Sequence, residues 1–334
     1  MKVAVLASIA WRTPPRHYGP WEQVASNITE GLMKRGVDVT LFATGDSITK
    51  ANLSTICETG YEENREQDAK VLECLHISNL MERASEFDII HNNFDFLPLT
   101  YSGLIKTPVL TTIHGFSSSK IIPVYKKYNR SSYYVSISDS DRSAELDYMA
   151  TVYNGINTND FEFNNEPDDY LLYFGRIHHD KGTAEAIEIA KKSNKRLIIA
   201  GLIQDENYFN EKIIPQLNSQ IGYVGNAGPA KRNALLKQAF ALLHPINFNE
   251  PFGMSVAEAM LCGTPVIAFN KGSMPELIKH EVTGFLVNNI QGATEAVSKV
   301  CNISRYDCYN WASSQFSCDK MVDDYLKLYK KILC

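Results

Sequence analysis

The sequence alternates short, continuous apolar runs with segments of helical periodicity. Residues 2–7 form the first run, an amphipathic helix follows at about 21–35, and a second run at 37–43 begins directly after Gly36, which ends that helix. Strands that are apolar throughout are typical of a parallel sheet with both faces covered by helices. Runs at 87–91, 108–114, 133–138 and 151–154 continue the pattern. The alternation predicts a parallel α/β fold.

A second set of runs begins at residue 170 and predicts a second domain of the same kind. The runs lie at 170–175, 196–201, 221–225, 241–245, 266–269 and 285–287. The polar, acidic stretch 157–169, which contains Pro167, is typical of an interdomain linker. A chain of 334 residues suits two ordinary domains. We therefore predict an N-terminal domain over 1–156, the linker, a C-terminal domain over 170–310 and a final helical segment over 311–334.

Within that final segment, residues 319–333 carry apolar side chains on one helical stripe, which indicates core packing. The stripe consists of Met321, Val322, Tyr325, Leu328, Tyr329 and Ile332.

Composition excludes several classes of protein. The chain is 44% hydrophobic and 21% charged, as in soluble globular proteins, and its net charge of -5 argues against a general nucleic-acid binder. The N-terminal apolar run is too short for a signal peptide, and no run approaches the roughly 20 apolar residues that span a bilayer. Seven cysteines include no C-x-x-C pair, which favours reduced packing residues in a cytoplasmic protein without zinc or disulfides.

Two glutamates mark the stretch 244–269 as a candidate ligand site. Glu250 lies in a loop kept irregular by Pro251 and Gly253, and Glu258 lies on the apolar helix that follows. The free amides at that helix start favour a phosphate, whereas ionised carboxylates accept hydrogen bonds from hydroxyls. A nucleotide sugar carries both groups. The alternative is an ordinary surface helix in which Glu258 is solvated and Glu250 is an N-terminal acid.

Two cations stand where the first strand of the second domain passes into a helix. Arg176 and Lys181 lie in the segment 175–182, at the edge where ligands collect in parallel sheets. A planar guanidinium and an ammonium at this edge can neutralise a diphosphate. The alternative is a surface turn, although a lysine has the wrong sign for a helix N-terminus.

The first domain offers weaker signals. Its first loop lacks G-x-G-x-x-G, which argues against a hydride-transfer enzyme, but Gly19 could let the backbone approach a phosphate or could be a plain turn glycine. His114 ends a predicted strand and is a candidate site residue. His91 ends a neighbouring strand and is a candidate cleft wall or acceptor contact. The run 125–130 interleaves bases with aromatics and is either a solvated helix face or a docking patch for an anionic acceptor or a membrane surface.

The run E-P-F-G-x-x-x-x-E-A-M-x-x-G-T-P-V-I at 250–267 and the segment G-R-x-x-x-x-K-G at 175–182 resemble family 4 of the nucleotide-sugar glycosyltransferases. These are retaining enzymes with the GT-B fold, in which two Rossmann-like doubly wound domains face a central cleft and a C-terminal helix crosses back to the N-terminal domain. The resemblance implies that Glu250 faces the donor sugar, Glu258 holds the ribose, and Arg176 and Lys181 clamp the diphosphate.

The resemblance assigns further residues of the chain. His114 would reach the donor sugar and its reaction centre, and Gly19 would approach the diphosphate, although Pro20 replaces the second glycine usual in the family. The nucleotide base would be held largely through backbone near Val224. The remaining donor-binding positions lie at the helix start and are Phe252, Gly253 and Met254.

The implied activity is transfer of a hexosyl unit, with retention, from a UDP- or GDP-linked sugar to a hydroxyl acceptor in glycan, glycolipid or glycoside biosynthesis. By this resemblance we expect no metal and no other cofactor. We expect a cytoplasmic enzyme, with peripheral contact to the inner face of a membrane as an additional interpretation. The alternatives are a sugar-nucleotide-binding protein without transferase activity and a GT-B sugar-nucleotide epimerase.

Overall fold

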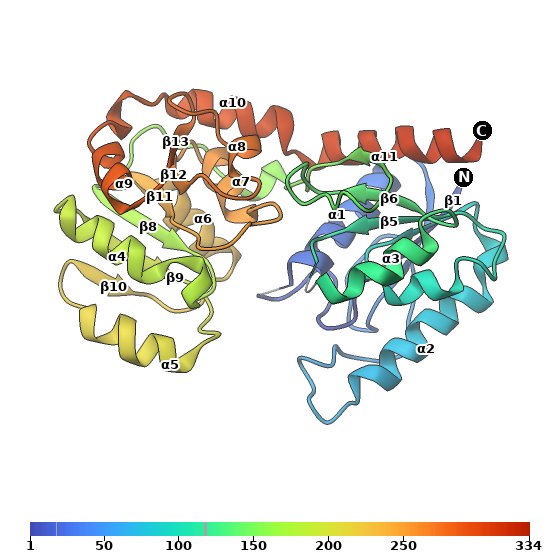
Figure 1. Cartoon of the computed structure of the whole chain (residues 1–334). Helices are drawn as coiled ribbons and strands as arrows, with labels where there is room; N and C mark the ends of the chain where they lie inside the picture. The colour runs from blue at the N-terminus through green and yellow to red at the C-terminus, as the bar shows by residue number, and fades with distance from the viewer. Residues whose placement is uncertain (18, 117–118) are drawn as a thin grey trace. The chain divides into compact units, whose positions relative to one another are not determined.

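The structure, a computed structural model, describes residues 1–17, 19–116 and 119–334 and divides the chain into two compact units (Figure 1). Unit 1 comprises Met1–Gly155 together with Cys318–Cys334, and unit 2 comprises Ile156–Ser317. Each unit is built around one parallel sheet. Two Rossmann-like α/β units, with the last helix assigned to the first unit, confirm the predicted fold class.

Unit 1 contains a seven-stranded sheet in the order β3-β2-β1-β4-β5-β6-β7. The strands are β1 (Lys2–Leu6), β2 (Asp38–Phe42), β3 (Asn52–Ser54), β4 (Ile89–Asn92), β5 (Val109–Ile113), β6 (Tyr133–Ser136) and β7 (Tyr148–Thr151). The helices are α1 (Pro20–Lys34), α2 (Ala69–Glu82), α3 (Ile122–Tyr128) and α11 (Cys318–Leu333). Strand β3, a short edge strand without an apolar run, is not among the predicted strands, and β7 begins three residues earlier than predicted.

Strand β1 explains why its sequence is apolar throughout. Val3 and Val5 point into a core with α1 and α11, whereas Ala4 and Leu6 point to the opposite face and a core with α2. All four side chains are inaccessible to solvent. Side chains alternate along a strand, so a sheet covered on both faces needs apolar residues at every position.

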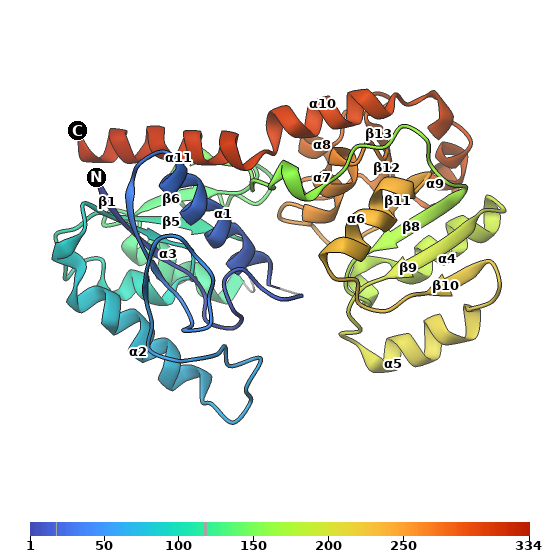
Figure 2. The same cartoon turned by 180° about the vertical axis from the view of Figure 1, so that it is seen from behind.

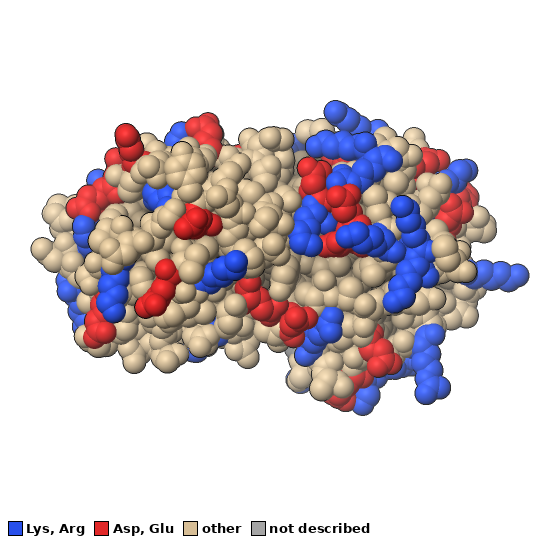
Figure 3. Space-filling view, turned by 90° about the horizontal axis from the view of Figure 1, so that it is seen from above, with Lys and Arg blue, Asp and Glu red and all other residues tan. Residues whose placement is uncertain are grey.

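Helix α11 packs along α1, as the rear view shows (Figure 2). A Cβ atom added to Gly31 would lie 2.4 Å from the side chain of Val322, so the two helices approach closely at this glycine. The predicted apolar stripe of α11 is confirmed, with Met321, Tyr325 and Tyr329 in the same core. The opposite face of α11 carries acidic and basic side chains interspersed (Figure 3), including the ion pair between Lys320 and Asp324.

His91 is part of the core of unit 1, and the interpretation of this residue as a cleft wall or acceptor contact is wrong. It is fully buried, and its Nδ1 lies 2.5 Å from the hydroxyl of Tyr329 on α11, whereas its Nε2 lies 2.8 Å from Oγ1 of Thr112. Thr112 is in turn 2.8 Å from the hydroxyl of Tyr325. Both ring nitrogens are thus committed to fixing α11 against the sheet.

Buried histidines make the stability of unit 1 depend on pH. Burial lowers the pKa of His91 from 6.5 to about 3 and that of His76 to about 4. The unfolded chain therefore takes up protons below about pH 6.5 that the folded chain does not, and stability falls as the pH falls from there towards the folded values. At about pH 5 we expect each histidine to cost about 2 kcal/mol of unfolding free energy.

Urea titrations at about pH 7.5 and pH 5 measure this loss. We expect His76→Gln to give a smaller difference between the two pH values than the parent chain, because one of these protons is no longer taken up on unfolding. The matched control is His17→Asn, at an exposed histidine of the same unit, and its pH dependence should equal that of the parent chain. Equal pH dependence in His76→Gln and the parent would contradict the expectation.

Unit 2 contains a six-stranded sheet in the order β10-β9-β8-β11-β12-β13, again with every pair parallel. The strands are β8 (Tyr170–Phe174), β9 (Arg196–Ala200), β10 (Ile221–Tyr223), β11 (Ala241–His244), β12 (Val266–Phe269) and β13 (Gly284–Val287). The helices are α4 (Thr183–Lys192), α5 (Glu206–Tyr208), α6 (Pro229–Gln238), α7 (Met254–Leu261), α8 (Met274–Leu277), α9 (Ile290–Val297) and α10 (Arg305–Gln315).

The stretch 157–169, which we predicted as a linker, is counted with unit 2, as are residues 311–317. A buried arginine explains why the stretch 157–169 is counted with unit 2. Arg305 donates to the carbonyls of Asn164, Lys237 and Ala239, so α10 fastens part of the stretch to the end of α6. In the part of the chain that the structure describes, no helix is long and apolar enough to cross a bilayer.

Candidate functional site

The candidate site of unit 2 lies where the strand order of its sheet reverses. Strands β8 and β11 are neighbours, yet the chain builds β9 and β10 on one side of them and β12 and β13 on the other. Loops that leave adjacent strands at such a point diverge, and the space beyond their carboxyl ends is the usual ligand position in open parallel sheets. The loops here are residues 175–182 after β8 and residues 245–253 after β11.

The first loop is held by the strands beside it. The amide of Gly175 donates to the carbonyl of Ala200 (3.1 Å), and the hydroxyl of Tyr173 donates to the carbonyl of Arg176 (2.8 Å). Gly201 permits this packing, because a Cβ atom there would lie 1.7 Å from the carbonyl oxygen of Gly175. The backbone of the predicted clamp is therefore fixed by residues outside the motif.

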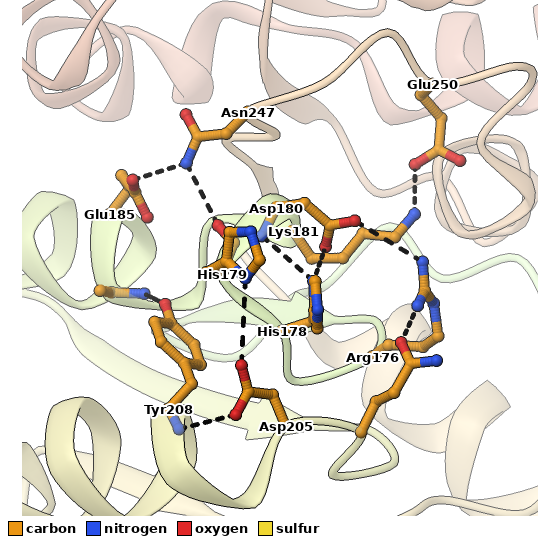
Figure 4. A network of polar contacts seen from close by, with 12 residues as sticks. Arg176, His178, His179, Asp180, Lys181, Glu185, Asp205, Tyr208, Asn247 and Glu250 are labelled. Atoms are coloured by element: carbon orange, nitrogen blue, oxygen red, sulfur yellow. Dashed lines mark hydrogen bonds and ion pairs between the residues drawn. The ribbon is translucent and has the colours of Figure 1, made fainter. Parts of the chain in front are cut away.

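The second loop rests on the first. The amide of Asn247 donates to the carbonyl of Asp180 (2.7 Å), and its side-chain amide donates to Glu185 (2.7 Å) (Figure 4). Gly182, at φ 76°, ends the first loop, and a Cβ atom on it would lie 1.9 Å from the carbonyl oxygen of Pro245. Glycine is thus required at position 182 both by the backbone conformation and by the close contact.

Lys181 and Glu250 form the ion pair at the centre of the site (Figure 4). Lys181 Nζ lies 2.5 Å from Glu250 Oε2, and both side chains are largely buried. His244, the last residue of β11, places Nε2 3.7 Å from the same carboxylate oxygen, which is beyond hydrogen-bond distance. Burial by itself raises the pKa of Glu250, but His244 and Lys181 outweigh it and hold the pKa at about 2. Glu250 is therefore ionised at neutral pH.

Arg176 stands beside this pair. Its guanidinium donates to the side-chain oxygen of Gln204 through Nη1, and its Nη2 lies 3.9 Å from Asp180 Oδ2. Figure 4 shows the guanidinium and the ammonium of Lys181 close to each other, although like charges repel. The two cations are held close together by separate acidic and amide partners. They therefore form a binding site for an anion of more than one charge.

Glu258 makes a separate ion pair. It lies on α7, is buried, and places Oε1 3.1 Å from Nη1 of Arg232 on α6. Burial raises the pKa of Glu258, which Arg232 partly offsets and Asp160 reinforces. The Nε atom of Arg232 is buried and has no hydrogen-bond partner. The described contacts thus join Lys181 to Glu250 and Arg232 to Glu258, without a bond between the two pairs.

The start of α7 has the predicted form. Gly253, at φ 92°, precedes Met254, the first residue of the helix, and amides of a first helical turn lack partners within the helix. Phe252 is 2% exposed, and its ring packs edge-on against Phe316. Ser273 precedes α8 without capping it through its side chain, and its hydroxyl donates instead to the carbonyl of Phe252 (2.6 Å). This bond fixes the approach to α7.

The backbone of Val224, expected near the nucleotide base, already makes two hydrogen bonds. Its amide donates to the carbonyl of Ile199 (2.9 Å), and its carbonyl accepts from Nζ of Lys231 (2.7 Å). The second lone pair of this carbonyl and the exposed ammonium of Lys231 are the groups left for a ligand.

His114 and Gly19 belong to unit 1. His114 follows β5, stacks on the ring of Trp21 at a centroid distance of 5.7 Å, and places Nε2 3.1 Å from Oδ1 of Asn93. Burial lowers its pKa to about 3, so the imidazole is neutral at physiological pH. A neutral imidazole offers one donor and one acceptor, which suits contact with sugar hydroxyls.

Gly19 immediately precedes α1 and has φ 153°. A Cβ atom on it would lie 2.8 Å from Pro15 and 2.9 Å from the carboxylate of Glu22, so the position is closely packed. Glu22 is buried, and burial raises its pKa. Tyr18, in the same predicted loop, lies outside the described residues.

The run 125–130 is largely occupied by contacts within unit 1. Tyr125 is 1% exposed and donates to Asp95 (2.9 Å). Lys126 pairs with Glu145 at 2.6 Å, and Asn129 donates to Asp147. These contacts are those of a helix with one buried and one solvated face. They favour the first interpretation of the run, a solvated helix face, over a docking patch.

Sequence reasoning missed His244, Asn247 and Arg232. His244 carried a signal, because it ends a strand next to the switch point, much as His114 directly follows β5. Asn247 lies inside the motif region but has no charge to draw attention. Arg232 had no signal, because its partner Glu258 lies 26 residues later in the chain on another helix.

Comparison with known proteins gives matches over nearly the whole chain. Residues 21–160 match the family described as Glycosyltransferase Family 4, and residues 156–306 match the family described as Glycosyl transferases group 1. An uncharacterized glycosyltransferase of Methanocaldococcus jannaschii is 22% identical over 331 residues, which cover 84% of each chain.

Solved structures share the fold. Sucrose-phosphate synthase of Thermosynechococcus elongatus superimposes with a TM-score of 0.80 at 17% identity, covering 99% of both chains. HepE of Anabaena in complex with UDP gives a TM-score of 0.76 at 18% identity, covering 99% of this chain and 100% of the other. HepE has also been solved in complex with UDP-glucose. The expected GT-B type of two-domain fold is thereby confirmed.

Proposed function

The chain belongs to family 4 of the glycosyltransferases, and from this premise we propose that it transfers a hexosyl unit, with retention, from a UDP- or GDP-linked sugar to a hydroxyl acceptor. The observation that carries the proposal is the contact of Lys181 with Glu250 at the switch point of unit 2, beside Arg176. Two cations next to an ionised carboxylate suit a ligand with a diphosphate at one end and hydroxyls at the other. The HepE complexes with UDP and UDP-glucose support this class of donor.

Each charged group has a role in this proposal. Arg176 and Lys181 bind the diphosphate together with the amides of Gly253 and Met254, and Gly19 is the further contact that the family resemblance assigns. Glu250 accepts hydrogen bonds from hydroxyls of the transferred sugar. In this scheme Lys181 lies between the diphosphate and Glu250 and thus couples the position of the phosphate to that of the sugar.

The remaining residues complete the donor site. Glu258 accepts hydrogen bonds from the ribose, and Arg232 holds its carboxylate in place. Val224 contacts the base through its carbonyl, and Phe252 supports the start of α7 from the core. His114, neutral through its lowered pKa, exchanges hydrogen bonds with the transferred sugar.

Retention follows from transfer on one face of the sugar. The acceptor oxygen forms a bond to the anomeric carbon, the bond from that carbon to the β-phosphate oxygen breaks, and the leaving phosphate takes the acceptor proton. The negative charge that grows on the leaving phosphate is stabilised by Arg176, Lys181 and the amides that precede α7. Because these groups neutralise the diphosphate, the proposed reaction needs no metal and should continue in EDTA.

A panel of sugar nucleotides tests the function directly. We expect one UDP- or GDP-sugar to raise the thermal unfolding temperature, since a ligand at about 100 times its dissociation constant adds about 2.7 kcal/mol of stability. With that donor and no acceptor, we expect slow release of the nucleoside diphosphate and free sugar, because water replaces the acceptor. Binding without any release would favour the non-transferring sugar-nucleotide binder, and a changed sugar still linked to the nucleotide would favour the epimerase.

A further inference from the structure

Two histidines and an aspartate of unit 2 gather beside the loop 175–182, with side chains that no step of glycosyl transfer uses. His178, His179 and Asp205 each offer one ligand atom, and these atoms lie within 4.8 Å of one another (Figure 4). We propose that these three residues bind a divalent transition-metal ion of the zinc class.

The backbone brings the ligands together before any ion arrives. His178 and His179 follow β8, whereas Asp205 follows β9 and precedes α5. The amide of Ile177 donates to the carbonyl of Leu202 (2.8 Å), and the amide of Asp205 lies 3.3 Å from the carbonyl of Ile177. These bonds extend the pairing of β8 with β9 past the ends of the strands, so the two loops are held in register.

Two of the three ligand groups are oriented by a second partner. His178 Nδ1 lies 2.6 Å from Oδ1 of Asp180, which leaves Nε2 with a free lone pair when the Nδ1 proton is donated to the carboxylate. A carboxylate behind the imidazole is the usual arrangement of metal-binding histidines, because it fixes the tautomer and raises the basicity of the ligand nitrogen. One oxygen of Asp205 accepts from the amide of Tyr208 (2.9 Å), so the other can face an ion.

The separation of the ligand atoms also suits a shared ion. Nδ1 of His179 lies 3.9 Å from Oδ2 of Asp205, which is too far for a hydrogen bond. Two ligands bound to one tetrahedral zinc ion at roughly 2.0–2.1 Å stand about 3.4 Å apart. His179 is 69% exposed, so a rotation of its side chain on binding the ion would close the difference.

The donor set selects the type of ion. Two imidazole nitrogens and one carboxylate oxygen suit Zn²⁺, Co²⁺ and Ni²⁺, whereas Mg²⁺ and Ca²⁺ prefer oxygen ligands. Three protein ligands leave a further position for water. The ion would brace the two loops around Arg176, whose guanidinium donates to Gln204, the neighbour of Asp205. The ion would not contact the reacting atoms, so transfer itself would not depend on it.

Cobalt binding to the chelator-treated full chain tests the proposal without measuring transfer. We expect one Co²⁺ per chain, with visible absorption bands of a low-coordinate nitrogen and oxygen site, competition by Zn²⁺ and none by Mg²⁺. His178→Ala, His179→Ala and Asp205→Asn should each weaken binding at least tenfold. Asp205→Asn retains a side-chain oxygen for the amide of Tyr208, so its folding is preserved.

The matched control is His280→Ala, which removes another exposed histidine of unit 2 that stands 4.0 Å from a carboxylate. This variant should bind Co²⁺ like the parent chain. Circular dichroism in EDTA checks that every variant is folded. The absence of stoichiometric binding, or equal binding by the parent chain and by folded Asp205→Asn, would overturn the proposal.

Discussion

Replacing Lys181 by alanine is expected to lower kcat/KM for the sugar nucleotide by about one hundredfold. The variant loses one charged contact to the diphosphate, and a charged hydrogen bond contributes about 1.5–3 kcal/mol. It also removes the cation that lies 2.5 Å from Glu250. We expect Arg176→Ala to cost between about ten- and one hundredfold, because it removes a diphosphate contact but leaves the carboxylate paired.

Lys181→Ala should also destabilise unit 2. Removing one partner of a buried ion pair costs about 3–5 kcal/mol, because the remaining charge is buried without compensation. The pKa of Glu250, now held at about 2, should rise in Lys181→Ala. Adding Glu250→Gln to this variant should restore part of the stability but none of the activity.

Steady-state kinetics and urea titrations of the single and double variants measure these effects. Lys192→Ala is the matched control, because Lys192 pairs with Glu188 on the surface of the same unit at 3.1 Å with both side chains about half exposed, and exposed pairs contribute little. Full activity in both Lys181→Ala and Arg176→Ala would remove the diphosphate clamp from the mechanism.

Gly182→Ala is expected to lower both stability and activity more than its small change in volume suggests. The added Cβ atom would lie 1.9 Å from the carbonyl oxygen of Pro245, so either α4 or the loop 245–253 must move. That loop carries Glu250, and a displacement of about 1 Å in a positioned catalytic group costs about one hundredfold in rate. We expect a loss of at least about 3 kcal/mol of stability, from overpacking together with backbone strain.

A second glycine separates the effect of overpacking from the effect of backbone strain. Gly36 has φ 74°, close to the 76° of Gly182, but a Cβ atom there meets nothing within 4 Å. Gly36→Ala therefore reports the backbone strain alone, about 1–2 kcal/mol. If both variants lose the same stability and both retain activity, the contact with Pro245 does not position the site.

Much of the fold could be read from the sequence. Parallel strands buried on both faces must be apolar at every position, so all strands except the edge strands β3 and β7 stood out at their positions as apolar runs. The same runs located the loops at their carboxyl ends, and with them Arg176, Lys181 and Glu250. These signals are local, because each depends on residues close together in the chain.

Other features required the tertiary structure, because they depend on partners far apart in sequence. His91 and His114 both end or follow central strands of one sheet, and no local pattern separates them. Helix α11, more than 200 residues later, covers His91 and occupies its Nδ1 through Tyr329, while Thr112 of β5 occupies its Nε2. His114 instead stays beside Trp21.

Neighbouring residues set strand burial and helix starts. They are therefore enough to specify that the chain forms two parallel sheets and which loops carry the paired charges. Which of these charges meet is set by the packing of the fold. Lys181 pairs with Glu250, 69 residues away, whereas Glu258, on the helix that follows, pairs with Arg232. The physical reason is that an ion pair depends on distance in space, which the packing of separate strands and helices fixes.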